Sequence, residues 1–353
     1  MYYSDAEKKG SGGGMNIEAV DLFCGVGGLT AGLIKSGIKV KAGYDIELMC
    51  RHGYEYNNNA VFVHKDVSEV TAHEINNWYS EGTVRLLAGC APCQPFSSYN
   101  QGKDATLDKK WPLLYHFMRL IEEVKPELVT MENVPDVTKH KVYHDFVAKL
   151  EELGYTVSAN KVDCVKYGVP QTRKRHVLLA SLVSKNIDLI PPTHDNPVTV
   201  RDVIKDLPVL YSGNRNKEDS LHVCSQLNDL NMKRIKASKP GGTWKDWPED
   251  LVAKCHTKES GKSYSGVYGR MEWDKPAPTM TTQCYGFGNG RFGHPSQHRA
   301  ISLREAAIFQ TFPEDYQFFD GELKIKSVGK MIGNAVPVRL GEIVGLSFKS
   351  SVI

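Results

Sequence analysis

The sequence has no apolar run long enough to cross a membrane and no segment that looks like a secretory leader. No stretch approaches the roughly 20 consecutive apolar residues of a membrane span. The N-terminus lacks the succession of basic, apolar and small residues that marks a secretory signal, so we expect a cytoplasmic protein whose eight cysteines stay reduced. A hydrophobic fraction of 41% and a charged fraction of 24% are ordinary for a soluble globular protein.

A strong net charge is missing too, and so are the paired motifs of a zinc site. The formal net charge of +3 permits a nucleic-acid partner without indicating one, because binding can depend on a local basic patch. Cys90 and Cys93 form the one C-x-x-C spacing, and without a second pair we expect no metal; a redox pair or half a zinc site is the alternative. His140 and His144 have no obvious third ligand, so we interpret them as solvated.

Most of the first half of the chain alternates between strand-like and helix-like patterns. Residues 1–14 are polar and end in Ser-Gly-Gly-Gly, which is typical of a disordered tail or linker. Apolar runs then predict strands near 17–23, 39–44, 60–64, 84–89, 127–131, 155–163 and 175–182. Helical patterns separate the first five strands, near 27–36, 47–57, 68–79 and 112–124. This alternation indicates an α/β fold with a doubly wound, parallel sheet.

Beyond about Ser184 the regular pattern ends. Prolines at 191, 192, 197 and 208 and Gly-rich stretches predict a smaller, loop-rich domain with few helices. Helical periodicity returns over 302–309, where Ser302 and Glu305 fit a capping box, and again after Pro337.

A glycine-rich turn, DLFCGVGG at residues 21–28, follows the first predicted strand. Small residues let the backbone approach a ligand closely, which favours a nucleotide-like cofactor; a plain tight turn is the alternative. A dinucleotide fingerprint would need a third glycine where this chain has Thr30. Asp45 and Asp66, at the ends of the next two strands, can accept hydrogen bonds from ribose hydroxyls and an exocyclic amine, although either could instead cap a helix.

Three further polar segments carry reactive side chains; the first two lie at the carboxyl edge of the predicted sheet, and the third precedes its last strand. In GCAPCQPFSS (residues 89–98), Pro92 and Pro95 stiffen the loop that carries Cys93, which suits a nucleophile. Strand five ends at Glu132. In QTRKR (171–175) the alternate arginines of an extended segment point to one side, so they could reach one phosphate and one base together. Read singly, these residues could be a buried structural carboxylate and a solvated edge.

Taken together, these motifs resemble those of the bacterial DNA (cytosine-5)-methyltransferases, in the usual order and over residues 16–353. The matching blocks include DLFxGxGG, PCQ, ENV and QxRxR, followed by REAA with QxFP (304–313) and GNAVPV (333–338). The resemblance implies the fold of the S-adenosylmethionine-dependent methyltransferases, with a mostly parallel, doubly wound sheet and a smaller target-recognition domain. It also implies methylation of cytosine in a short DNA sequence, as in restriction-modification systems.

The resemblance further implies the domain organisation and the partners. After the tail at 1–14, residues 15–185 would form the catalytic and cofactor-binding domain, 186–300 the target-recognition domain, 301–325 a hinge, and 326–353 a return to the catalytic domain. The cofactor would be S-adenosyl-L-methionine and the substrate double-stranded DNA. We expect a monomer with no membrane partner, acting separately from any cognate restriction endonuclease.

Residue by residue, the resemblance assigns a cofactor site and a catalytic set. The residues expected at the cofactor are Phe23, Gly25, Gly28, Asp45, Ile46, Asp66, Val67, Pro92, Asn334 and Ala335. Asp45 would hold the ribose and Asp66 the adenine, although Asp45 and Ile46 stand where the family often has Glu and an aromatic residue. The expected catalytic residues are Cys93, Glu132, Arg173 and Arg175.

The implied reaction begins with a cytosine that is rotated out of the duplex. Cys93 would attack C6 of the base, Glu132 would hydrogen-bond or protonate N3, and Arg175 would hold the exocyclic oxygen. We expect Gln94, Ser97 and Arg173 to contact DNA phosphates. Cationic reach toward the major groove would come from Lys236, Lys239, Lys245, Arg270 and Arg291.

Three rival functions remain to be weighed. A transfer-RNA cytosine methyltransferase would share the catalytic loop, but the Cys-Phe-Thr signature that we associate with that branch is absent. A catalytically silent DNA-binding protein would not need Cys93, Glu132 and Arg175 together. A nicotinamide-dependent oxidoreductase is disfavoured by Thr30 and by the Pro-Cys-Gln loop.

Overall fold

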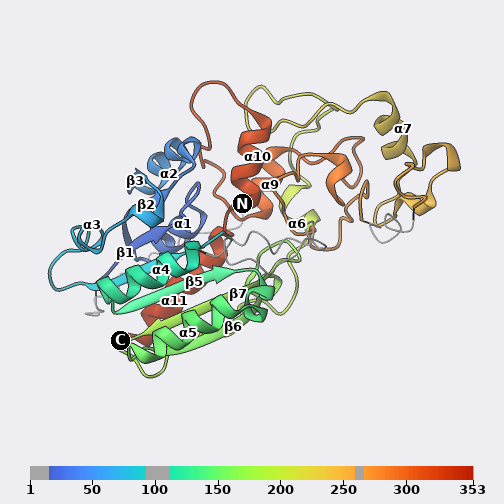
Figure 1. Cartoon of the computed structure of the whole chain (residues 1–353). Coiled ribbons are helices and arrows are strands. Elements are labelled where there is room, and N and C mark those ends of the chain that lie inside the picture. The colour runs from blue at the N-terminus through green and yellow to red at the C-terminus, as the bar shows by residue number, and fades with distance from the viewer. Residues whose placement is uncertain (1–15, 93–111, 259–265, 353) are drawn as a thin grey trace.

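The computed structural model describes residues 16–92, 112–258 and 266–352. Its centre is a seven-stranded sheet with the strand order β3-β2-β1-β4-β5-β7-β6 (Figure 1). The strands are β1 (Ile17–Leu22), β2 (Lys39–Asp45), β3 (Val61–His64), β4 (Val84–Gly89), β5 (Leu128–Asn133), β6 (Thr156–Asp163) and β7 (Lys174–Ser181). All seven lie within two residues of the predicted ranges, since each is a short apolar run between polar turns.

The direction of β7 departs from the all-parallel sheet that alternation alone suggested. The first five strands in this order, β3, β2, β1, β4 and β5, run parallel to one another. Strand β7 pairs antiparallel with both β5 and β6. A short connection between β6 and β7 allows this, because antiparallel neighbours need no crossover helix. The expectation of a doubly wound, mostly parallel sheet is confirmed.

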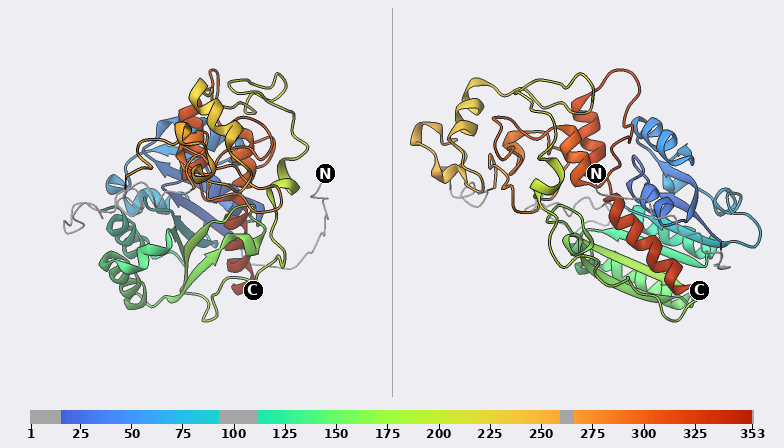
Figure 2. Two further views of the ribbon diagram at one scale, coloured as in Figure 1. Left: turned by 90° about the vertical axis from the view of Figure 1, so that its right-hand side faces the viewer. Right: turned by 180° about the vertical axis from the view of Figure 1, so that it is seen from behind.

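Helices cover both faces of the sheet (Figures 1 and 2). Side chains alternate along each strand, so in β1 Ile17 and Ala19 join one apolar core while Val20 and Leu22 join the other. The second core is covered by α3 (Ala72–Asn76), α4 (Pro112–Val124) and α5 (Lys141–Glu152). The first is covered by α1 (Gly28–Lys35), α2 (Arg51–Asn58) and α11 (Val338–Ser351).

The helix expected over 68–79 is interrupted. A 3₁₀ turn, η2 (Val67–Glu69), is followed by extended backbone at Val70 and Thr71, and α3 then occupies only five residues. Thr71 caps α3 through a reciprocal hydrogen-bonded pair with Glu74, which fixes the start of the helix. Local capping therefore overrides the longer apolar periodicity.

The last helix of the chain lies against the first. Glycines permit this close crossing of α1 and α11, because a Cβ atom at Gly32 would stand 2.3 Å from the carbonyl oxygen of Val338, and one at Gly341 would stand 2.8 Å from that of Leu29. The right-hand view of Figure 2 shows α11 over the sheet. The C-terminal segment thus supports the helix that follows the glycine-rich turn.

Residues between β7 and α9 (Leu303–Phe309) form the loop-rich region, which extends away from the sheet (Figure 1). The α-helices described in this region are short, α6 (Val200–Ile204) and α7 (Asp229–Ala237), as the prolines and glycines predicted. The outer part has a small core of its own around Trp244, Trp247 and Leu251. The inner part shares the core of the sheet's α1 face.

The other elements in the described residues are short turns and the helix α10 (Ile325–Asn334), which comes just before α11. The 3₁₀ turns are η1 (Leu48–Cys50), η5 (Pro135–Lys139), η6 (Cys164–Tyr167), η7 (Trp244–Asp246), η8 (Glu249–Leu251) and η9 (Phe287–Asn289). Among the residues described, no helix combines the length and apolar character needed to cross a membrane.

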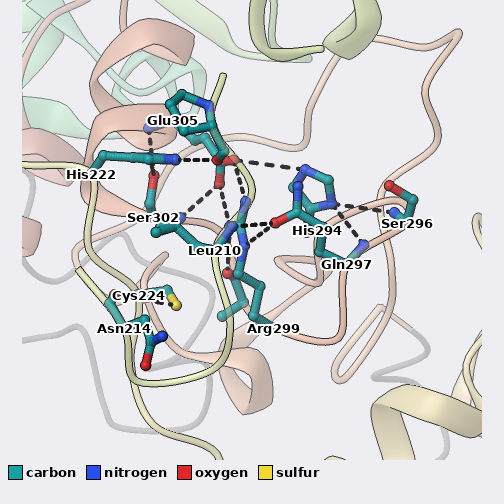
Figure 3. A network of polar contacts seen from close by, with 12 residues as sticks. Leu210, Asn214, His222, Cys224, His294, Ser296, Gln297, Arg299, Ser302 and Glu305 are labelled. Carbon is teal, nitrogen blue, oxygen red and sulfur yellow. Dashed lines mark hydrogen bonds and ion pairs between the residues drawn. The ribbon is translucent and has the colours of Figure 1, made fainter. Parts of the chain in front are cut away.

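A buried ion pair sits where the loop-rich region joins α9 (Figure 3). Arg299 donates two hydrogen bonds to Glu305, at 2.7 and 2.8 Å, and both side chains are fully buried. Glu305 also accepts a bond from the backbone N–H of Ser302, which completes the predicted capping box of α9. Arg299 holds the pKa of Glu305 down, at about 2, even though burial acts to raise it.

Two histidines complete this junction cluster of Arg299, Glu305, Ser302, His222 and His294. His222 bridges the Ser302 hydroxyl and the Pro208 carbonyl. Nδ1 of His294 accepts two backbone N–H bonds, so in the neutral ring the proton belongs on Nε2, 3.7 Å from Glu305. Burial lowers the pKa of His294 to about 4. Within the described residues, the polar side-chain atoms of this cluster are thus buried and either hydrogen-bonded or ion-paired.

Candidate active site

The predicted functional residues converge on one edge of the sheet. The carboxyl ends of β1, β2, β4 and β5 meet there, because parallel strands in register end together. The start of β7 reaches the same edge, since it runs antiparallel and pairs His176 with Asn133. The glycine-rich turn, the segment entering the Cys93 loop, Glu132 and Arg175 therefore lie around a common region.

The glycine-rich turn is held open by Asp45. Gly25 has φ of 51°, and a Cβ atom there would meet nothing within 4 Å. Its N–H donates to Oδ2 of Asp45 at 2.8 Å, while Oδ1 accepts from the N–H of Glu47 at 2.8 Å. Phe23 also has a positive φ, of 58°, which a bulky side chain seldom adopts without a functional reason. Open space beside Gly25 and the half-exposed Asp45 carboxylate could accept a ligand.

Gly28 is required by packing. A Cβ atom at this position would stand 2.2 Å from the carbonyl oxygen of Val336 and 3.2 Å from Cβ of Ala335. The motif that ends α10 is thereby brought against the turn, with Asn334 exposed and Ala335 buried. The structure thus unites two predicted cofactor segments that are far apart in sequence, although Gly28 itself faces protein backbone.

The other predicted cofactor residues differ in exposure. Asp66 caps η2 by accepting from the N–H of Ser68, as its helix-cap alternative predicted, and this bond lowers the pKa of the carboxyl group. Val67 beside it is buried. Ile46 is 60% exposed, which is unusual for a large apolar side chain and leaves it available to cover a flat ligand. Pro92 is exposed at the end of the described segment.

A buried carboxyl group, Asp21, lies beneath the turn. Burial raises the pKa of Asp21 to about 7, although the hydroxyl of Thr30 donates to its Oδ2 at 2.7 Å. Among the described residues, nothing hydrogen-bonds to its other oxygen. Thr30, which stands where a dinucleotide fingerprint would have its third glycine, therefore serves as the hydrogen-bond donor to Asp21.

Glu132 lies between a thiol and a guanidinium. The side chain is 6% exposed, Oε2 accepts from Sγ of Cys90 at 2.8 Å, and Oε1 is 2.8 Å from Nε of Arg175. The contact with Arg175 is an ion pair without the alignment of a hydrogen bond, so Oε1 has no hydrogen-bond donor within the described residues. A buried acceptor without a hydrogen-bond donor costs free energy, so Oε1 is suited to form a hydrogen bond with a ligand.

Gln171 and Arg173 of the QxRxR motif bond to other parts of the protein, whereas Arg175 faces Glu132. Gln171 bonds to the Phe309 carbonyl, to Gln310 and to the Met280 N–H, and it is fully buried. Arg173 donates to the carbonyls of Met280 and Ala335. These two side chains join the start of β7 to the loop-rich region and to the α10–α11 connection.

Arg173 does not take the position expected of a phosphate contact or a catalytic group. It is 3% exposed, and its guanidinium donates to carbonyl groups of the protein. Burial lowers its pKa to about 10. Arg175 alone reaches the carboxylate. The sequence showed the charge of both arginines but not which of them is enclosed by segments from elsewhere in the chain.

Arg270 requires a similar correction. It was expected to extend toward DNA, but it is 3% exposed and donates to the carbonyls of Ile235, His294 and Gln297. Of the other predicted cations, Lys236, Lys239 and Lys245 are exposed and Arg291 is half-buried. Of the five cations that were expected to face DNA, the three lysines are therefore the exposed ones.

Three predicted residues, Cys93, Gln94 and Ser97, lie outside the described residues. The backbone that enters their loop is described as far as Pro92. Cys90 N–H donates to the Leu22 carbonyl at 3.3 Å, and the Asn133 amide donates to the Ala91 carbonyl at 3.2 Å. The entry to the loop is thus attached to β1 and β5.

Sequence reasoning missed two side chains at this edge. Cys90 was considered only as a partner of Cys93, yet it donates to Glu132. His176 is 4% exposed and packs edge-on against Tyr143 at 4.9 Å between ring centroids. The pattern of β7 could have flagged it, because a histidine inside an apolar run is enclosed when the strand is central. Within the described residues, no cluster of three His, Cys, Asp or Glu side chains suits a metal ion.

Comparison with known proteins gives a consistent result. The family model for C-5 cytosine-specific DNA methylases matches residues 17–350. The Type II methylase M.HgiDII of Herpetosiphon aurantiacus is 54% identical over 94% of each chain. The Type II methyltransferase M.Eco47II of Escherichia coli is 31% identical over 93% of this chain and 78% of its own.

Solved structures agree in fold. A putative DNA modification methyltransferase encoded within an E. coli prophage superposes with a TM-score of 0.68, at 23% identity, over 95% of this chain and 99% of that one. The S. pombe Dnmt2 methyltransferase superposes with a TM-score of 0.59, at 18% identity, over 94% and 97% of the two chains. At these identities the likeness concerns the fold alone.

Proposed function

The chain belongs to the C-5 cytosine-specific DNA methylase family and is a DNA cytosine-5 methyltransferase, and we propose that it works through a covalent bond between Cys93 and a flipped-out cytosine. The observation that carries the proposal is Glu132 at the sheet edge. Its Oε1 lacks a hydrogen-bond donor and lies beside Arg175, next to the segment that leads to Cys93.

We propose S-adenosylmethionine as the methyl donor, bound at the glycine-rich turn. The fit is supported by the open space at Gly25 and by Asp45, whose oxygens each accept one backbone bond and keep a second lone pair. Exposed Ile46 is positioned at the end of β2 to cover an adenine ring, with Asp66 following the next strand. Bound there, the cofactor would supply an electrophilic methyl group.

The proposed chemistry follows from what carbon 5 of cytosine lacks, which is nucleophilic character. The thiolate of Cys93 adds to C6, and the electron pair released from the C5–C6 double bond moves into the ring. Glu132 donates a hydrogen bond or a proton to N3, and Arg175 holds the exocyclic oxygen, so developing charge is neutralised. After C5 has been methylated, a base or water removes its proton, N3 returns its hydrogen to Glu132, and the C5–C6 double bond re-forms as Cys93 leaves as thiolate.

Arg175 must change partners in this scheme. In the structure Arg175 forms an ion pair with Glu132, in which the two opposite charges offset one another. With a base in the site, the Glu132 carboxyl group, protonated from water at Oε1, would donate to N3, and the guanidinium would donate to the exocyclic oxygen. Rotating the base out of the stack costs about a few kcal/mol, which these new contacts help to offset.

Trapping with a modified substrate tests the covalent step. DNA with 5-fluorocytosine at the target position should become attached to Cys93 when cofactor is present, because fluorine cannot leave C5 as a cation and elimination stalls. Cys93→Ser should abolish the adduct, and Cys90→Ser should retain it. Peptide mapping and denaturing electrophoresis read the result. An active enzyme that gives no adduct, or one mapped to Cys90, would contradict the mechanism.

We further propose that residues 186–300 choose the target sequence, within the domain division 15–185, 186–300, 301–325 and 326–353. The support is the separate outer core around Trp244 and the exposed lysines of this region. Exchanging 186–300 for the corresponding segment of a relative should transfer target choice while Cys93 and Glu132 keep the chemistry. Base-resolution methylation maps decide this, and a map that still follows the donor of residues 15–185 would refute it.

A further inference from the structure

Cys90 has no assigned part in the reaction, yet it contacts the carboxylate on which the reaction depends. Its thiol is half-buried and donates to Oε2 of Glu132 at 2.8 Å. The residue belongs to the short segment between β4 and the loop that carries the proposed nucleophile.

The position of this thiol is fixed by the backbone on both sides. The Cys90 N–H is bonded to the Leu22 carbonyl at the end of β1, and the following carbonyl, of Ala91, accepts from the Asn133 amide at the end of β5. Asn133 and Glu132 are neighbours on the same strand. The entry to the loop is therefore attached to β5 through two adjacent side chains, one of which is Glu132.

The two oxygens of Glu132 are consequently not equivalent. Oε2 already accepts a hydrogen bond from Cys90, whereas Oε1 has only the unaligned ion pair with Arg175. A proton on Oε2 would confront the S–H donor and force it away. A proton on Oε1 leaves the bond from Cys90 intact, since a carbonyl-like oxygen still accepts.

We propose that Cys90 is a positioning residue that keeps Oε2 of Glu132 occupied, so that Oε1 carries the hydrogen directed at the base. This rests on the proposed function, in which Glu132 serves N3 of the cytosine. The thiol also fixes the carboxyl plane relative to the entry of the Cys93 loop.

A packing role is the competing explanation, because Cys90 also contacts the apolar core of the α1 face. The two explanations differ in what a substitution should do. If Cys90 only fills space, Ala and Ser should act alike and merely alter stability. If its donor matters, Ser should replace it and Ala should not.

The test compares Cys90→Ala and Cys90→Ser with wild-type protein, and uses the exposed Cys255→Ala as a control for loss of a thiol. Methyl transfer to DNA that carries the mapped target is followed across pH in single and multiple turnovers. For Cys90→Ala we expect kcat to fall about fivefold to tenfold, with the KM for S-adenosylmethionine changed by less than about twofold. Its pH–rate profile should move to higher pH, because a carboxylate that loses a donor is easier to protonate.

Cys90→Ser should restore most of the rate and the original pH profile, and Cys255→Ala should match wild type. Thermal unfolding checks that each variant is folded. Equal rates and unshifted profiles for Cys90→Ala and wild type would overturn the inference, as would equal defects in Cys90→Ala and Cys90→Ser. Wild-type protein that methylates no DNA would instead refute the proposed function, so the two failures can be told apart.

Discussion

The junction cluster and the sheet edge both bury charged side chains, but they treat those charges differently. At the junction, Arg299 donates two hydrogen bonds to the Glu305 carboxylate. The backbone N–H of Ser302 donates a third hydrogen bond to the same carboxylate. At the edge, Asp21, Glu132 and His176 each keep a buried polar atom with no hydrogen-bond partner in the described part of the chain. The closed cluster contributes to the fold, while the open atoms cost stability.

The two regions should therefore respond oppositely to substitution. Removing a partner from the closed cluster leaves an uncompensated charge inside the protein. At the open edge, substitution of Asp21 or His176 by a side chain of similar size relieves part of a cost that the folded protein already bears. Substitutions should thus affect stability mainly at the junction and activity mainly at the edge, and four variants measure the difference.

The largest effect is expected from Glu305→Ala. This change leaves the fully buried guanidinium of Arg299 unpaired and removes the cap of α9, which should lower the free energy of unfolding by about 3 to 5 kcal/mol. Urea unfolding followed by circular dichroism measures the loss. Glu132→Ala is the matched carboxylate at the edge, and we expect it to cost less stability while abolishing methyl transfer. Equal losses of stability would remove the distinction between the regions.

An intermediate effect with a pH signature is expected from Asp21→Asn. The folded-state pKa of Asp21 is raised to about 7, so the folded protein holds a proton that the unfolded chain releases above about pH 4. Stability from this group is complete at low pH and is lost as pH rises through 7. The amide stays neutral, and Asp21→Asn should be more stable than wild type at pH 8 by about 1 to 3 kcal/mol, with the gain shrinking toward pH 4. Thermal unfolding at both pH values tests this.

The junction cluster has the opposite dependence, which serves as the internal control. The pKa of Glu305 is lowered to about 2 and that of His294 to about 4, so the unfolded chain takes up protons first as the solution is acidified. Stability from these groups is present at neutral pH and is lost as pH falls below about 6.5 for His294 and below about 4.5 for Glu305. Asp21→Asn should leave this acid-side loss unchanged.

The smallest effect is expected from His176→Leu. Leucine has a similar volume and no polar atom, whereas the buried Nε2 of His176 has no hydrogen-bond partner among the described residues. Burial also lowers the pKa of His176, so at pH 5 the wild type loses stability that the variant keeps. We expect a change within about 1 kcal/mol at pH 8 and a gain at pH 5. A clear loss of stability at both pH values would mean that the imidazole is structurally satisfied.

How much of this could be read from the sequence differs with the kind of interaction. Strands were predictable because a central strand is a short apolar run, and the Ser302–Glu305 cap was predictable because its partners are three residues apart. The direction of β7 and the partner of Glu305 depend on contacts between distant segments. Arg173 and Arg270 were misassigned for the same reason, since a sequence shows a charge but not the carbonyls that enclose it.

The candidate site shows the same limit. Motif order was enough to bring Gly25, Asp45 and Glu132 to one edge of the sheet, because the ends of parallel strands meet. The spacing of residues in the sequence predicts neither the hydrogen bond from the Cys90 thiol to Oε2 of Glu132 nor the close packing that requires glycine at position 28. Both depend on angles and on close approaches of a few ångströms, which the fold alone determines.

The contact between Gly28 and Val336 has a consequence for how the protein is made. The glycine-rich turn leaves the ribosome early, but the backbone it packs against is about 300 residues further along the chain. At ribosomal speeds of about 5 to 20 residues per second, the turn waits roughly 15 to 60 s for that partner. A nascent chain therefore has no finished turn until α11 has been synthesised and has docked. Translation that stops short of α11 would release a product with its sheet largely encoded but its glycine-rich turn unsupported.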